Sequence, residues 1–75
     1  MAKNKSQRTI KKELYNWYRE TMTEHGLSWN GASAILVDEY RESDIKEDKE
    51  IYALLIDVNE GLLRDIRHEL EDELR

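Results

Sequence analysis

The chain has 75 residues, no cysteine, no proline and a formal net charge of −5. This length supports one small core, and the absence of cysteine excludes a disulfide framework and a thiolate–zinc site. The sequence has no apolar run near the ~20 residues of a membrane span and no signal-peptide core, so we expect a cytoplasmic protein. Since so small a core supplies only about 3–5 kcal/mol, we expect oligomerisation to add buried area.

Charge is unevenly distributed along the chain. Up to Lys12 the sequence has five basic residues and no acid, whereas from Glu13 onward it has 7 bases and 17 acids. The amino-terminal arm therefore carries +5 and the remainder −10. Such a basic stretch is typical of a nucleic-acid-binding arm, although a solvated terminal tail has the same composition.

The arm itself, with the sequence KSQRTI over residues 5–10, is short and polar for a core helix. We therefore predict an extended strand. Its alternating faces would carry Lys5, Gln7 and Thr9 on one side and Ser6, Arg8 and Ile10 on the other. A single short strand needs a partner for its backbone, which two copies pairing antiparallel across a two-fold axis would supply.

Two helices are predicted after the arm. Over residues 12–25 an apolar stripe recurs at helical spacing, and Gly26 follows as a left-handed residue just past the helix end. This stripe consists of Leu14, Trp17, Tyr18 and Met22. Ser28 is a good N-cap for a second helix that runs to about residue 42. The inward stripe of that helix consists of Ala32, Leu36, Val37 and Tyr40.

A third periodic segment is predicted over residues 47–74, after a polar stretch in which Ser43 or Asp44 can cap the helix. Its apolar stripe consists of Ile51, Leu55, Val58, Leu62, Ile66 and Leu70. The spacing of these residues is longer on average than a heptad and favours a straight helix over a left-handed zipper. Asn59 and Gly61 are weak points at which a bend is expected.

The order strand, helix, turn, helix resembles the ribbon-helix-helix (Arc, Mnt and MetJ-like) family of DNA-binding proteins. The stretches TIKKELYNW, EHGLSWN and ILVDEY carry the resemblance, which covers roughly residues 3–42. The matching positions are Ile10, Leu14, Gly26, Ser28, Leu36, Val37 and Tyr40. The chain departs from the family at Ser6 and Arg8, where Val, Ile or Phe is preferred, and at Lys11, which replaces a frequent proline.

The resemblance implies a mainly α fold, with a ribbon-helix-helix DNA-binding domain over residues 1–43 and a helical oligomerisation segment over residues 44–75. In this family the paired strands enter the major groove of double-stranded DNA and read base edges. The implied base-reading residues are Lys5, Gln7 and Thr9. The implied phosphate-binding residues are Lys3, Arg8, Lys11, Lys12, Ser28, Trp29 and Asn30.

The third segment exceeds what the minimal family fold needs. Because two helices already fill the core of a ribbon-helix-helix dimer, the stripe from Ile51 to Leu70 would be exposed on a dimer. We therefore expect it to join two homodimers into a homotetramer that grips repeated or palindromic sites.

The expected function is a sequence-specific DNA-binding regulator, either a repressor or an accessory (relaxosome) protein of a plasmid or phage. Two alternatives remain: an antitoxin whose residues 44–75 bind a toxin, and a helical adaptor without a DNA role. We expect no enzyme activity and no cofactor, because His25 and His68 are far apart and no glycine-rich phosphate loop is present.

Overall fold

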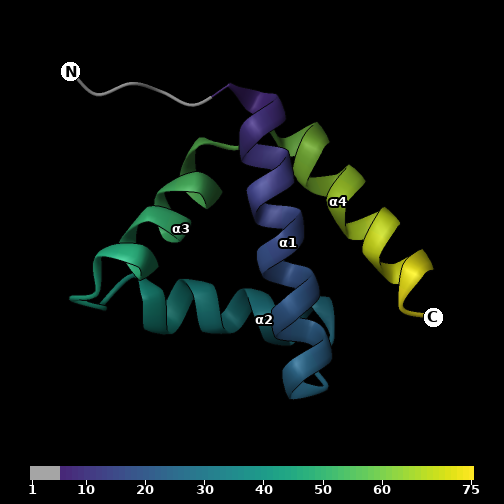
Figure 1. Cartoon of the computed structure of the whole chain (residues 1–75), viewed down its shortest axis with the longest axis horizontal. Helices are drawn as coiled ribbons and strands as arrows, with labels where there is room; N and C mark the ends of the chain where they lie inside the picture. Colours follow the sequence, from purple (N-terminus) through teal and green to yellow (C-terminus); the bar gives the residue numbers. More distant parts are fainter. Residues whose placement is uncertain (1–5) are drawn as a thin grey trace.

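The computed structural model describes residues 6–75, and this part of the chain is built from helices. Four are α-helices, α1 (Gln7–His25), α2 (Trp29–Ile35), α3 (Lys46–Asp57) and α4 (Glu60–Glu73), and a π-helix, η1 (Leu36–Tyr40), continues α2. Helix α1 contacts α2, α3 and α4. In Figure 1 it lies between α3 and α4 and crosses α2, and α4 runs in the same general direction as α1.

The prediction of a strand over residues 5–10 is wrong for residues 6–10, the part of this range that the structure describes. Ser6 is the N-cap of α1, and its Oγ accepts a hydrogen bond of 3.2 Å from the backbone N–H of Thr9. Gln7 to Ile10 then form the first helical turn. Because residues 6–75 contain no strand, the ribbon and with it the ribbon-helix-helix fold are overturned.

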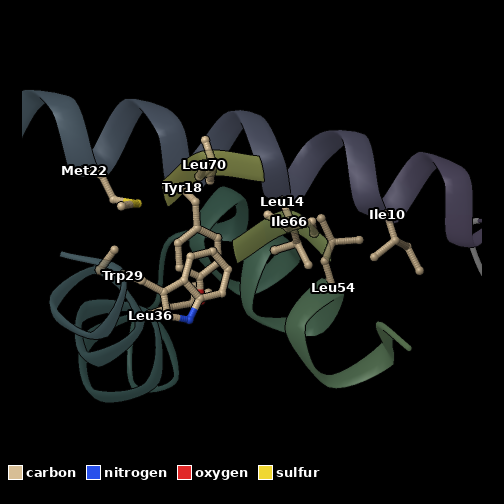
Figure 2. Packing of buried hydrophobic residues seen from close by; sticks show 10 residues of the cluster. Ile10, Leu14, Tyr18, Met22, Trp29, Leu36, Leu54, Ile66 and Leu70 are labelled. Carbon is tan, nitrogen blue, oxygen red and sulfur yellow. The ribbon is translucent and has the colours of Figure 1, made fainter. Parts of the chain in front are cut away.

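The physical reason is the position of Ile10. It lies four residues before Leu14, and both side chains are almost completely buried. A helix over these residues extends the buried stripe of α1 by one turn, whereas a strand would have left Ile10 dependent on a second copy. The stripe, which Figure 2 shows pointing toward the other helices, consists of Ile10, Leu14, Tyr18 and Met22.

The predicted turn between the first two helices is confirmed. Gly26 has φ of 62°, the left-handed conformation expected just past the end of α1. Ser28 caps α2, and its Oγ accepts a hydrogen bond of 3.2 Å from the N–H of Gly31. Of the inward stripe predicted for the second helix, Ala32 and Leu36 are buried, whereas Val37 is 38% exposed.

The third periodic segment is two helices rather than one. Val58 and Asn59 have extended backbone angles between α3 and α4, so the chain breaks at one of the two expected weak points. This break allows α3 and α4 to lie on different sides of α1 (Figure 1). The buried cluster draws on both of the expected segments, residues 1–43 and 44–75, because Leu54, Ile66 and Leu70 join the α1 stripe in it.

Candidate nucleic-acid interface

The amino-terminal half of α1 carries the basic residues that the structure describes from the arm. Its first turn holds no acid, and Arg8 and Lys12 are both exposed. These two residues are four apart and therefore neighbours on the helix surface. Asn16, also exposed, continues the same row one turn further along. Lys3 and Lys5 lie outside the described residues.

The row formed by Arg8, Lys12 and Asn16 lies on the side of α1 that faces away from the core. On an α-helix each residue advances by about 100°, which places Lys12 nearly opposite the buried Leu14. The other helices therefore leave this row open to solvent. Below, "the α1 basic row" denotes these three residues.

Lys11 faces a different side of α1. Its Nζ lies 3.1 Å from Oε2 of Glu69 on α4. Both side chains are partly exposed, so this ion pair adds little to stability, but it offsets the charge of Lys11. The phosphate contact expected for Lys11 would have to compete with Glu69.

A second group of charged residues links α1 to the end of α4. The Tyr15 hydroxyl donates a hydrogen bond to Glu73, and Nε of Arg19 lies 2.5 Å from the same carboxylate. The hydrogen bond from Tyr15 and then the one from Arg19 hold the pKa of Glu73 below its ordinary value. The same bond, followed by burial, raises the pKa of Tyr15. These contacts join the middle of α1 to the carboxyl-terminal end of α4.

Gln7 and Thr9, two of the expected base-reading residues, make contacts within the chain. Nε2 of Gln7 donates to the carbonyl oxygen of Asp57 at 3.2 Å, and its Oε1 accepts from the N–H of Asn59 at 2.9 Å. The amide therefore spans the break between α3 and α4. The Thr9 hydroxyl accepts a hydrogen bond of 3.0 Å from the Ser6 hydroxyl, inside the α1 cap. Without a strand, neither residue lies on the ribbon face that implied base reading.

The three residues expected to bind phosphate at the start of the second helix differ in their surroundings. Ser28 uses its hydroxyl for the cap of α2. Trp29 is only 7% exposed and stacks on Tyr18, with ring centroids 3.8 Å apart and an interplanar angle of 9°. Asn30 is exposed. Trp29 therefore belongs to the core, whereas Ser28 and Asn30 are exposed and Ser28 uses its hydroxyl in the cap.

The six residues expected to join two dimers lie mostly in the core of the single chain. Ile66 and Leu70 are fully buried, and Ile51, Leu55 and Val58 pack against the buried cluster. Leu62 is half-buried. The break after α3 folds the stripe onto α1, so the stripe is not left exposed as the tetramer prediction required. The homotetramer remains an untested prediction, but it can no longer be argued from an exposed stripe on α3 and α4.

Helices α3 and α4 are acidic, whereas α2 has no charged residue. Helix α3 has two bases and four acids, and α4 has two bases and six acids. In residues 6–16, by contrast, three bases accompany one acid, Glu13. The charge segregation seen along the sequence therefore persists as a difference between the amino-terminal half of α1 and the helices α3 and α4.

Open grooves lie on both sides of Trp29 among the described residues. One has a volume of about 470 Å³ and lies between the α1–α2 turn and the end of α4, where Trp29, Glu71 and Leu74 line it. The other, of about 260 Å³, lies between Trp29 and the outer side of α4, beside Arg64 and Arg67. In the first groove the Ser28 hydroxyl accepts from the α2 cap and the Thr23 hydroxyl donates to the carbonyl oxygen of Arg19, so both are engaged by the backbone.

The grooves are not joined by a metal site or a membrane span in the part of the chain that the structure describes. The described residues contain no group of three or more side chains that could hold a metal ion. No described helix has both the length and the apolar character needed to cross a membrane. Comparison with protein-family models, with curated proteins and with solved structures found no match.

Proposed function

We propose that the protein is a small regulator that binds double-stranded DNA in the cytoplasm through the amino-terminal half of α1. The observation that carries this proposal is the charge segregation: +5 up to Lys12 and −10 after it. Arg8 and Lys12 would contact phosphates, as would Lys3 and Lys5, which lie outside the described residues.

The α1 basic row suits a helix that lies against a groove rather than a ribbon inside it. An α-helix with its side chains is about 10–12 Å across and the major groove is about 12 Å wide, so an exposed helix face fits there. Arg8 and Lys12 are exposed on that face, and no described helix packs over them. Asn16 follows them on the same face, and an asparagine amide can pair with adenine.

The acidic helices support the same orientation. With six acids on α4 and four on α3, any approach of DNA to these faces is repelled. Repression and accessory roles at a plasmid or phage site would use the same contacts.

Fluorescence anisotropy with a labelled duplex at several salt concentrations tests the proposal. Affinity should fall steeply between about 50 and 200 mM salt, because bound phosphates release counterions. Arg8→Ala and Lys12→Ala should each lower the slope of log affinity against log salt by about one.

Arg64→Ala is the matched control, because it removes one exposed positive charge from α4 instead of α1. It should leave the salt slope unchanged. If Arg64→Ala and Arg8→Ala have equal effects, binding follows only net charge and the α1 site is wrong. If the wild-type chain does not bind any duplex at low salt, the DNA function is wrong.

A further inference from the structure

The outward face of α3 carries large apolar side chains that the single chain leaves uncovered. Ile45, the N-cap residue, is 57% exposed and Ile56 is 64% exposed. Lys49, which is exposed, and Tyr52, which is half-buried, lie between them, and the spacing of 4, 3 and 4 residues places all four side chains on one face. Below, "the α3 outer stripe" denotes these four residues.

At about 100° per residue, the α3 outer stripe lies opposite the buried Leu54, the centre of the face by which α3 packs on the protein. That inner face is formed by Leu54, which is buried, and by Ile51 and Leu55, which pack against the core. A single exposed isoleucine is ordinary on a protein surface. Two of them in line with a tyrosine, on a helix whose other side is already buried, form an apolar strip of the kind found at interfaces.

We infer that the α3 outer stripe binds the same stripe of a second copy, with the two helices antiparallel. The stripe is symmetric about the midpoint between residues 50 and 51. A two-fold axis at that point places Ile45 against the partner's Ile56 and Lys49 against the partner's Tyr52. Each pairing then occurs twice, as a closed two-fold interface requires.

The charges agree with this register. The Lys49 ammonium would lie at the partner's Tyr52 ring, where a cation–π contact offsets the desolvation of the lysine. At the edge of the stripe, Lys46 would approach the partner's Asp57, and both of these side chains are exposed in the single chain. The register places Lys49 opposite the partner's Tyr52, with the partner's Lys49 offset from it by about 4.5 Å along the helix axis.

A second copy is favoured over an unrelated protein because the stripe complements itself. An isoleucine stands at each end, and the lysine and the aromatic ring stand at equivalent inner positions. One helix pair buries less area than the about 1,600 Å² of a typical stable interface. The dimer should therefore dissociate on dilution.

Light scattering over a range of concentrations provides the first test. The wild-type mass should rise from 9.0 kDa toward twice that value as concentration increases. Ile56→Lys should stay at the monomer mass, because it places a charge at each end of the interface. Val37→Lys is the matched control, since it alters a residue on η1 that is also exposed, at 38%, but lies outside the stripe.

Circular dichroism should show equal helix content in both variants, because both substitutions are at exposed positions. A wild-type chain that is monomeric at every concentration would overturn the inference. So would an Ile56→Lys variant that dimerises like Val37→Lys.

Cysteine cross-linking tests the register, and the natural chain has no cysteine to interfere. Ile45→Cys mixed with Ile56→Cys should form a disulfide dimer at least several-fold faster than either variant alone. In the antiparallel register identical positions are about 16 Å apart, because eleven residues of helix separate 45 from 56. Faster cross-linking of either variant with itself would overturn the antiparallel arrangement.

Discussion

The ring of Tyr18 on α1 stacks on the indole of Trp29 at the start of α2, at a centroid distance of 3.8 Å (Figure 2). The Tyr18 hydroxyl also lies 2.8 Å from the Ser33 hydroxyl, one turn further along α2. Burial raises the pKa of Tyr18, and the hydrogen bond with Ser33 opposes part of this shift. This pair of aromatic residues joins α1 to α2.

Trp29→Ala removes a large buried ring and leaves a cavity beside Tyr18, which costs about 3–5 kcal/mol. Because this equals the whole stability expected of so small a core, the variant should be largely unfolded and show no cooperative transition. The adjacent substitution Asn30→Ala, at an exposed side chain, should have an effect within about 0.5 kcal/mol. Urea unfolding followed by circular dichroism measures both. If the two variants are equally stable, Trp29 does not contribute to the core.

Gln7→Ala should lower the free energy of unfolding by about 1–2 kcal/mol, because both hydrogen bonds across the α3–α4 break are lost. Lys12→Ala, in the next turn of α1, should leave stability nearly unchanged. The measurement is again urea unfolding. A Gln7→Ala variant as stable as the wild type would show that the amide does not hold the break.

The glycines offer a pair of substitutions with opposite expected signs. Gly26→Ala should destabilise by about 1 kcal/mol, since Gly26 has φ of 62° and a side chain strains that conformation. Gly61→Ala should stabilise by about 0.5 kcal/mol, because Gly61 is helical and a Cβ there meets no atom within 4 Å. Thermal unfolding of the two variants should therefore shift in opposite directions.

The contacts of Glu73 should make the folded chain less stable at acid pH than at neutral pH. Its pKa is held below the ordinary value of 4.5, so the folded chain binds fewer protons there than the unfolded chain does. The resulting stability is present above about pH 4.5 and is lost as the pH falls through the folded pKa. Glu73→Gln should therefore lose less of its melting temperature between neutral and acid pH than the wild type does.

Asp72→Asn is the control for that pH series. Asp72 is the neighbouring acid and lies 3.8 Å from Arg75, with both side chains about 80% exposed. Its replacement should leave the acid dependence as in the wild type. If Glu73→Gln and Asp72→Asn behave alike, the contacts of Tyr15 and Arg19 with Glu73 do not stabilise the fold.

Local sequence signals identified several features correctly because they depend only on neighbouring residues. Gly26 ends α1 and Ser28 caps α2, as predicted. The apolar spacing from Leu14 to Met22 predicted the buried face of α1, and Asn59 marked a break. Charge segregation up to Lys12 can also be read directly from the residues, and it carries the proposed function.

Only the tertiary structure decided whether the arm is a strand or a helix. Five polar residues followed by one isoleucine are compatible with both, and the local clue, Ser6 capping the N–H of Thr9, is common to turns and helices. Ile10 buries its side chain in the cluster that Leu54 and Ile66 also form, which makes the helix favourable within one chain.

Packing within the single chain also determined that the apolar stripe of residues 51–70 faces α1 and not another subunit. Ile66 and Leu70 are apolar at helical spacing whether they face their own α1 or another subunit, so periodicity alone could not distinguish the two. The break at Val58 and Asn59, held by the distant Gln7, turns α4 back along α1 and buries them internally. The helix caps and the charge pattern could thus be read from neighbouring residues in the sequence. Contacts between residues about fifty positions apart decided which helix faces are buried.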